Sequence, residues 1–403
     1  MLPRPSLSFT LPSIQDNTKL DCRVYHPACL KGPLGPSDKS WHRHAAIVAH
    51  PYAPLGGSYD DPVVILISST LLHLGFVVVT FNFRGAPSSH GRTSWTSKPE
   101  RADYISVAGF LVYYMHYLRP RQHPPSAANE NAPSPIFLLA GYSYGAMVTM
   151  QLPPLDSFLS DFASPATHTP MADIRLRAQH LAEQQTVMST TPSSPRKSLG
   201  MRVGGDEDIS SPNARDKLRA HSREREERIR KGVRELLARH KLNHREKTHN
   251  PTDQFQRVER EEPCLESIDN LIRFRCAYLL VSPPLGIVTN LATMNFSNPF
   301  SSWSRRRKGG PLSVRNHEGD VKQEETAAEA KLIRHPTLAI YGDQDGFLTL
   351  KKMHEWTTQL RSAEGSLFQH VEVSGAGHFW MEEGVVYELR KAVSSFAARL
   401  TKS

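Results

Sequence analysis

Cysteine is scarce in this sequence, and long apolar runs are missing from it. Four cysteines in 403 residues are too few and too scattered for a disulfide framework or a zinc site; they are Cys22, Cys29, Cys264 and Cys276. No stretch is apolar over the ~20 residues that a membrane helix needs. The first fifteen residues alternate like a strand and lack the apolar core of a signal peptide. From these absences we expect a soluble cytoplasmic protein.

Positive charge is concentrated in two short segments. The formal net charge is +9, but residues 213–247 alone hold 13 Lys and Arg against 6 Asp and Glu, and 305–308 add four positive charges. Within 213–247, apolar residues recur at helical spacing on a charged surface, which predicts an amphipathic helix; they are Ile229, Val233, Leu236 and Leu237. Such a segment could contact anionic lipid, RNA or a protein partner. The rest of the chain is close to neutral, so charge does not define its main ligand.

Apolar, β-branched runs alternate with helical patterns along most of the chain. Two strands at 7–14 and 20–26 should form a hairpin, and further strands are predicted at 44–49, 76–81, 136–140, 274–281, 336–341 and 370–373. Helices are predicted at 60–74, 101–118, 144–151, 350–360 and 382–400. This alternation predicts an α/β fold, with a mostly parallel sheet and helices on both faces.

Two polar stretches interrupt the alternation. We expect one folded domain in three parts, 1–153, 266–297 and 331–403. Between them lie a low-complexity basic insertion at 154–265, with one helix near 213–247, and a second polar insertion at 298–330. Their composition, rich in Ser, Thr, Pro and charged residues, buries too little apolar surface to fold. Outside 213–247 the first insertion is therefore expected to be disordered.

The sequence Gly141-Tyr142-Ser143-Tyr144-Gly145 joins a predicted strand to a predicted helix. A G-x-S-x-G turn in this context forces the serine into a strained conformation and lifts its hydroxyl from the sheet edge. Glycine at both flanks lets strand and helix approach, and the helix N-terminus presents free N–H groups beside the serine. Ser143 is thus a candidate nucleophile; the alternative is a plain strand-to-helix turn.

An aspartate and a histidine follow two later strands. The segment 342–346 reads GDQDG and the segment 375–380 reads GAGHFW. The ends of parallel strands meet at one sheet edge, so Asp345 and His378 should lie near Ser143. Asp343 is the alternative carboxylate, and whichever of the two is not used could cap the following turn.

These motifs, in this order, resemble the α/β-hydrolase superfamily. The nearest likeness is to small, soluble predicted hydrolases with an H-P-x-x-x-x-G-G loop, here His50 to Gly57, and an N-F-R-G strand end, here Asn82 to Gly85. The resemblance covers 7–153 and 266–400 and leaves the insertions unexplained. It implies that Ser143 is the nucleophile, His378 the general base and then acid, and Asp345 the carboxylate that orients the imidazole.

The resemblance also implies an oxyanion hole made by the backbone N–H groups of Tyr52 and Tyr144. Arg84 is expected to tie loops together, and His50 to brace its loop and border the substrate site. Pro283 and Leu285 are the other candidate substrate-binding residues, and with the two tyrosines they suggest an apolar, aromatic mouth. The nineteen histidines lack a supporting ligand set, so no metal is expected, and the reaction needs no organic cofactor.

The function that follows is a serine hydrolase that cleaves a small-molecule ester, thioester or amide through an acyl-enzyme. Carboxylesterase activity is the default, and hydrophobic acyl or aryl groups are the expected substrates. The alternative is a non-catalytic binding or scaffold protein on a hydrolase fold, which uses its basic insertion to contact anionic lipid, RNA or a protein partner.

Overall fold

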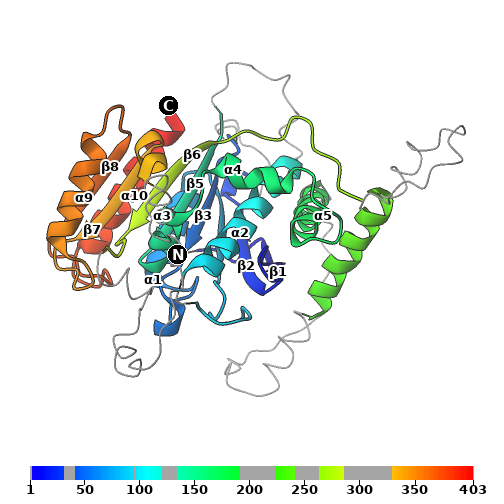
Figure 1. The fold of residues 1–403 in the computed structure, drawn as a ribbon, viewed down its shortest axis with the longest axis horizontal. Helices are drawn as coiled ribbons and strands as arrows, with labels where there is room; N and C mark the ends of the chain where they lie inside the picture. The colour runs from blue at the N-terminus through cyan, green and yellow to red at the C-terminus, as the bar shows by residue number, and fades with distance from the viewer. Residues whose placement is uncertain are drawn as a thin grey trace, which may run out of the picture.

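An eight-stranded sheet with the order β1-β2-β4-β3-β5-β6-β7-β8 forms the centre of the molecule (Figure 1). The computed structural model describes residues 2–30, 41–94, 96–119, 134–190, 223–240, 263–285 and 329–402. The hairpin of β1 (Leu7–Pro12) and β2 (Lys19–Tyr25) is antiparallel, and β2 also runs antiparallel to β4. The other neighbours pair in parallel: β3 (Ala45–Ala49), β4 (Val77–Phe81), β5 (Ile136–Tyr142), β6 (Arg275–Val281), β7 (Thr337–Gly342) and β8 (Phe368–Val373).

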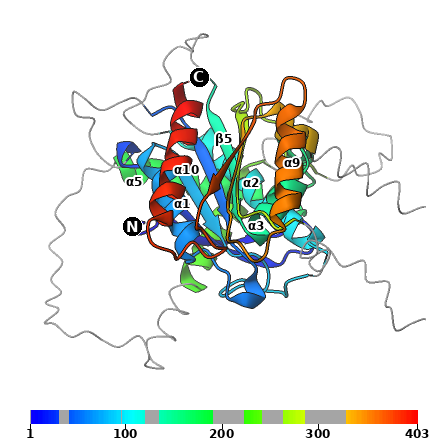
Figure 2. The same cartoon turned by 90° about the vertical axis from the view of Figure 1, so that its left-hand side faces the viewer.

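Helices cover both faces of this sheet. α1 (Pro62–His73) and α10 (Val385–Lys402) lie on one face, whereas α2 (Lys98–Tyr117), α3 (Tyr144–Gln151) and α9 (Leu350–Ser362) lie on the other (Figure 2). Every residue of β3, β4 and β5 is buried, as expected for strands covered on both sides. The predicted strands and helices of this domain are confirmed; α2 begins three residues before the prediction because Pro99 is tolerated in a first turn.

The first predicted insertion contains more structure than we expected. Besides the helix at 223–240, it contains α4 (Leu155–Leu159) and α5 (Pro170–Thr190), so the prediction of order at 213–247 alone is wrong. Ile174, Ala178 and Leu181 of α5 are buried in the core cluster shared with α2. Packing on a neighbouring helix thus stabilises a segment whose own sequence is mostly polar. Within the two predicted insertions, residues 191–222, 241–262 and 298–328 lie outside the described residues.

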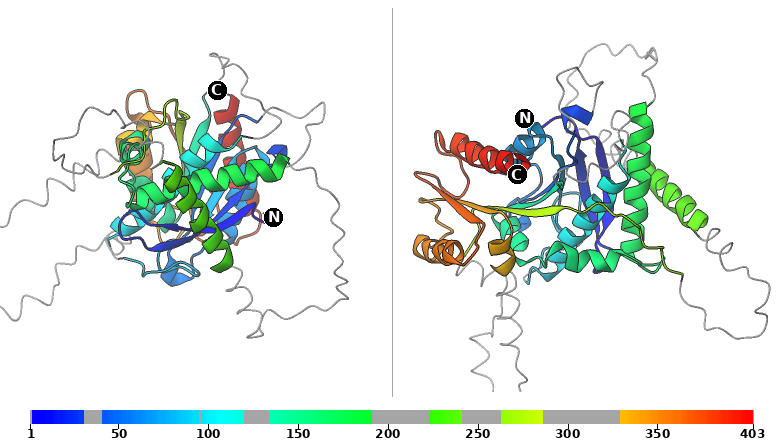
Figure 3. Two further views of the ribbon diagram at one scale, coloured as in Figure 1. Left: turned by 90° about the vertical axis from the view of Figure 1, so that its right-hand side faces the viewer. Right: turned by 90° about the horizontal axis from the view of Figure 1, so that it is seen from above.

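The helix at 223–240 crosses α5 on the outside of the molecule (Figure 3). Leu236 joins Leu176 of α5 and Leu265 in a small apolar cluster, and Ile229 is 3% exposed. Glu226 accepts hydrogen bonds from the Thr10 hydroxyl at 2.6 Å and from an Arg177 guanidinium N–H at 3.0 Å. The apolar stripe predicted for this helix therefore faces the protein.

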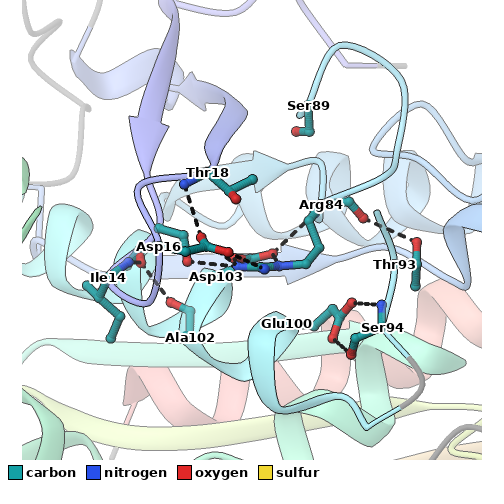
Figure 4. A network of polar contacts seen from close by, with 12 residues as sticks. Ile14, Asp16, Thr18, Arg84, Ser89, Thr93, Ser94, Glu100, Ala102 and Asp103 are labelled. Carbon is teal, nitrogen blue, oxygen red and sulfur yellow. Dashed lines mark hydrogen bonds and ion pairs between the residues drawn. The ribbon is translucent and has the colours of Figure 1, made fainter. Parts of the chain in front are cut away.

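Arg84 connects three elements at the end of β4 (Figure 4). Its guanidinium donates to Asp103 of α2 at 2.6 and 2.9 Å, and to Asp16 in the β1–β2 turn at 2.9 Å. Only 5% of Arg84 is exposed. The expectation that this arginine ties loops together is confirmed. Within the ranges that the structure describes, no helix combines the length and apolar character needed to cross a membrane.

Candidate active site

Ser143 lies in a strained turn between β5 and α3. Its φ of 53° and ψ of −117° are uncommon for a residue with a Cβ. A Cβ added at Gly141 would lie 2.3 Å from the carbonyl carbon of Gly145, and a Cβ at Gly145 would lie 2.6 Å from the carbonyl oxygen of Ala49. Both glycines are therefore required by the close approach of strand and helix, as the sequence predicted.

His378 connects Ser143 to Asp345. Its Nε2 lies 2.8 Å from the Ser143 Oγ, and its Nδ1 lies 2.7 Å from the Asp345 Oδ2. In the tautomer with hydrogen on Nδ1, the ring donates to the carboxylate and accepts from the serine hydroxyl. The Tyr142 hydroxyl donates to the backbone carbonyl of His378 at 2.7 Å, and the amide of Phe347 donates to Asp345 at 2.9 Å. Asp345 and Ser143 thus orient the imidazole through its two nitrogens, and His378 is only 8% exposed.

Asp343 has a different set of partners. It accepts hydrogen bonds from the Ser374 hydroxyl at 3.1 Å and the Gly375 amide at 2.7 Å, in the turn that follows β8. It therefore fastens the loop that carries His378, while Asp345 contacts the histidine itself. Of the two carboxylates left open by the sequence, the geometry selects Asp345 as the partner of His378.

A cavity of about 400 Å³ opens at this edge of the sheet, where Ser143 and His378 form part of its wall. Five aromatic side chains supply much of the remaining wall: Tyr52, Tyr142, Tyr144, Phe347 and Phe379. The loop after β3 and two further residues complete the lining: Pro51, Leu55, Gly56, Gly57, Asp61 and Pro284. The described wall is thus mainly apolar and aromatic.

The two predicted oxyanion residues, Tyr52 and Tyr144, both line the cavity that Ser143 borders. Tyr144 begins α3, so its backbone N–H belongs to the helix's first turn and has no partner within the helix. Tyr52 follows the histidine-proline pair of the loop after β3, and the rings of Tyr52 and Tyr144 are 5.1 Å apart. A Cβ at Gly57 would lie 2.2 Å from the Pro51 carbonyl oxygen, so the glycine lets this loop fold tightly beside Ser143.

His50 does not border the cavity, which corrects its assignment to substrate binding. Its ring is fully buried; Nε2 accepts the Phe83 amide at 2.9 Å, and Nδ1 lies 2.6 Å from the Pro51 carbonyl oxygen. Both ring nitrogens are thus occupied by backbone groups, and burial lowers the pKa of His50 to about 4. The histidine braces the loops after β3 and β4, the other role we expected for it.

Pro284 contacts the cavity, whereas Pro283 and Leu285 are absent from its described lining. The sequence located the tail of β6 at the right edge but misassigned the residue that faces the site. Phe347, Phe379 and Asp61 were missed. Phe379 directly follows His378 and Phe347 lies two residues after Asp345, positions that could have pointed to them; Asp61 had no signal beyond the start of a helix.

Among the described residues, no group of three or more His, Cys, Asp or Glu side chains is placed to hold a metal ion. Asp61 lines the cavity near His378. Burial raises the pKa of its carboxyl group, and hydrogen bonds from the amides of Val63 and Val64 oppose that shift.

The chain has the α/β-hydrolase fold, which is defined here by the strand order and by the serine turn after β5.

No family model and no curated protein matches the sequence. Among solved structures, an α/β serine hydrolase homologue from Coxiella burnetii is 14% identical over 98% of this chain and 99% of its own, with a TM-score of 0.43. An α/β serine hydrolase without a lid from Xanthomonas campestris is 17% identical over 100% and 98%, with a TM-score of 0.43. A Pyrococcus furiosus esterase is 12% identical over 98% and 92%, with a TM-score of 0.44.

Proposed function

We propose that this protein is a serine hydrolase that cleaves carboxylic esters through an acyl-enzyme. The observation that carries the proposal is the continuous hydrogen-bonded series Ser143, His378 and Asp345 at the wall of an apolar cavity. A nucleophile, a base within hydrogen-bond reach and a group that orients the base are the three parts of nucleophilic acyl transfer.

The reaction follows from these contacts. His378 Nε2 accepts the proton of Ser143 as Oγ attacks the carbonyl carbon of the substrate, and Asp345 stabilises the imidazolium that forms. Collapse of the tetrahedral intermediate breaks the bond to the leaving group, which takes the proton from Nε2. A water molecule, activated by the same nitrogen, then attacks the acyl-enzyme and releases the acid and the serine.

The developing oxyanion would be bound by the backbone N–H groups of Tyr144 and Tyr52. The start of α3 supports the first, because N–H groups at a helix N-terminus attract negative charge. The tight loop after β3 supports the second, since it carries Tyr52 to the wall of the same cavity.

The aromatic wall favours hydrophobic acyl or aryl groups, with thioesters and amides as further substrates of the same chemistry. A series of p-nitrophenyl esters of increasing acyl length measures this. We expect kcat/KM to rise with acyl length until the cavity of about 400 Å³ is filled. A flat series would contradict the preference.

A fluorophosphonate probe tests the proposed nucleophile. We expect the folded wild type to be labelled and Ser143→Ala not to be labelled. Ser374→Ala is the matched control, because Ser374 is an exposed serine four residues before His378 whose hydroxyl donates to Asp343. Absent labelling of folded wild type, or labelling that survives in Ser143→Ala, would contradict the proposal.

A second candidate is a binding role for the basic outer side of the helix at 223–240. Its apolar side is buried, but several arginines and a lysine are exposed, among them Lys231, Arg234 and Arg239. Such a surface would bind anionic vesicles or RNA with an affinity that falls as salt rises. Co-sedimentation of wild type and a triple Glu variant of these residues tests it, and equal sedimentation of the two would contradict it.

A further inference from the structure

Asp61 is the only Asp, Glu, Lys or Arg among the described residues that line the cavity. It ends the loop after β3 and caps α1, and its Oδ1 accepts the Val63 amide at 2.8 Å and the Val64 amide at 3.3 Å. One oxygen of the carboxylate is therefore committed to the helix, which fixes the side chain at the wall.

The second oxygen of Asp61 has no partner within the described part of the chain. No hydrogen bond reaches its Oδ2, and no Lys or Arg forms an ion pair with it. The neighbouring Asp60 differs, because Arg23 pairs with it at 2.5 Å. A half-buried carboxylate without a counterion is costly, and a cationic ligand would recover part of that cost.

Aromatic rings surround the same space. The Phe347 ring lies 4.6 Å from the His378 ring, and the Phe379 ring lies 5.5 Å from it. Tyr52 and Tyr144, whose rings are 5.1 Å apart, line the same cavity. Aromatic faces attract organic cations, most strongly where water is excluded. A carboxylate among aromatic rings is the combination that binds an alkylammonium group.

We propose that the substrates of this site carry a cationic ammonium group beside the scissile ester, with Asp61 as the residue that selects for it. This inference rests on the proposed function of the same site. The ammonium group would lie between the free Asp61 oxygen and the aromatic wall while the carbonyl carbon lies at Ser143. The cavity of about 400 Å³ has the size of a small-molecule site.

The test compares two esters that differ only in charge, 2-(trimethylammonio)ethyl butyrate and its uncharged isostere 3,3-dimethylbutyl butyrate. The quaternary group has no N–H, so a preference for it reports charge and not hydrogen bonding. We expect wild type to hydrolyse the cationic ester with a kcat/KM at least about tenfold higher, which corresponds to the strength of a desolvated cation–π contact.

Asp61→Asn is the informative variant. An asparagine keeps the oxygen that caps α1 and removes only the charge. We expect the ratio of the two kcat/KM values to fall close to one. Asp60→Asn is the control: it removes a carboxylate one residue away, outside the cavity, and should leave the ratio at its wild-type value.

The outcomes separate this inference from the proposed function. Turnover of the neutral ester by wild type with no preference for the cation, or an unchanged ratio in Asp61→Asn, overturns the cation selectivity and leaves the hydrolase intact. No turnover of either ester, together with absent fluorophosphonate labelling, overturns the proposed hydrolase and with it this inference.

Discussion

Two aspartates, two residues apart, have separate tasks at the end of β7. Asp345 contacts His378 at 2.7 Å, whereas Asp343 holds the backbone of Gly375. We expect Asp345→Asn to lower kcat for p-nitrophenyl butyrate by about 10³- to 10⁴-fold, because an amide no longer fixes the reactive tautomer of the histidine. Asp343→Asn, measured in the same assay, should cost only a few-fold; equal losses would contradict the division of roles.

Gly145, two residues after Ser143, cannot carry a side chain because a Cβ there would collide with backbone atoms, which cannot rotate away. A Cβ at Gly145 would lie 2.6 Å from the Ala49 carbonyl oxygen, whereas a Cβ at Gly346 would meet nothing within 4 Å. Gly145→Ala should lower the free energy of unfolding by about 3 kcal/mol or more and abolish fluorophosphonate labelling, since strand and helix must move apart. Gly346→Ala is the control, and urea titration of both variants measures the difference.

At the scale of elements, His50 joins the loops that follow β3 and β4. Its folded pKa is about 4 and its ordinary value is 6.5, so between these values the unfolded chain binds the extra proton. The contribution of neutral His50 to the free energy of unfolding is then fully present above pH 6.5 and is lost as pH falls toward 4. The loss from this residue is about 3 kcal/mol.

Unfolding free energies of wild type and His50→Gln between pH 7 and pH 4 check this. We expect a flatter profile in the variant, with a residual slope from His44, whose pKa burial also lowers to about 4. Parallel profiles for wild type and His50→Gln would show that the proton is not excluded at His50.

The helix at 223–240 is attached to the domain in part by a small apolar cluster. Leu236 is 7% exposed in a cluster with Leu176 and Leu265. Leu236→Ala should weaken the docking by about 2 to 3 kcal/mol and increase protease cleavage within the helix. Arg234→Ala, on the exposed side, should be cut at the wild-type rate, and identical cleavage of the two variants would exclude this mode of attachment.

For the whole molecule, the sequence predicted what depends on chain order and periodicity. Ser143, Asp345 and His378 each follow their own strand, and parallel strands bring such ends together regardless of the side chains between them. The prediction that His50 borders the substrate site was wrong because its ring is buried against the backbone groups of Phe83 and Pro51. The orientation of a side chain depends on packing, which the sequence pattern does not give. The prediction named Pro283 and Leu285, but Pro284 lines the cavity, because successive residues of an extended segment point in opposite directions. α5 was missed because its buried face exists only against α2.

The distance along the chain between Ser143 and His378 determines when the site can first exist. The two residues contact each other although they lie 235 positions apart in the sequence, so Ser143 is synthesised long before His378. At synthesis rates of about 5 to 20 residues per second, this interval is roughly 10 to 50 s. A nascent chain that has not yet reached residue 378 therefore carries the proposed nucleophile without the histidine proposed to activate it.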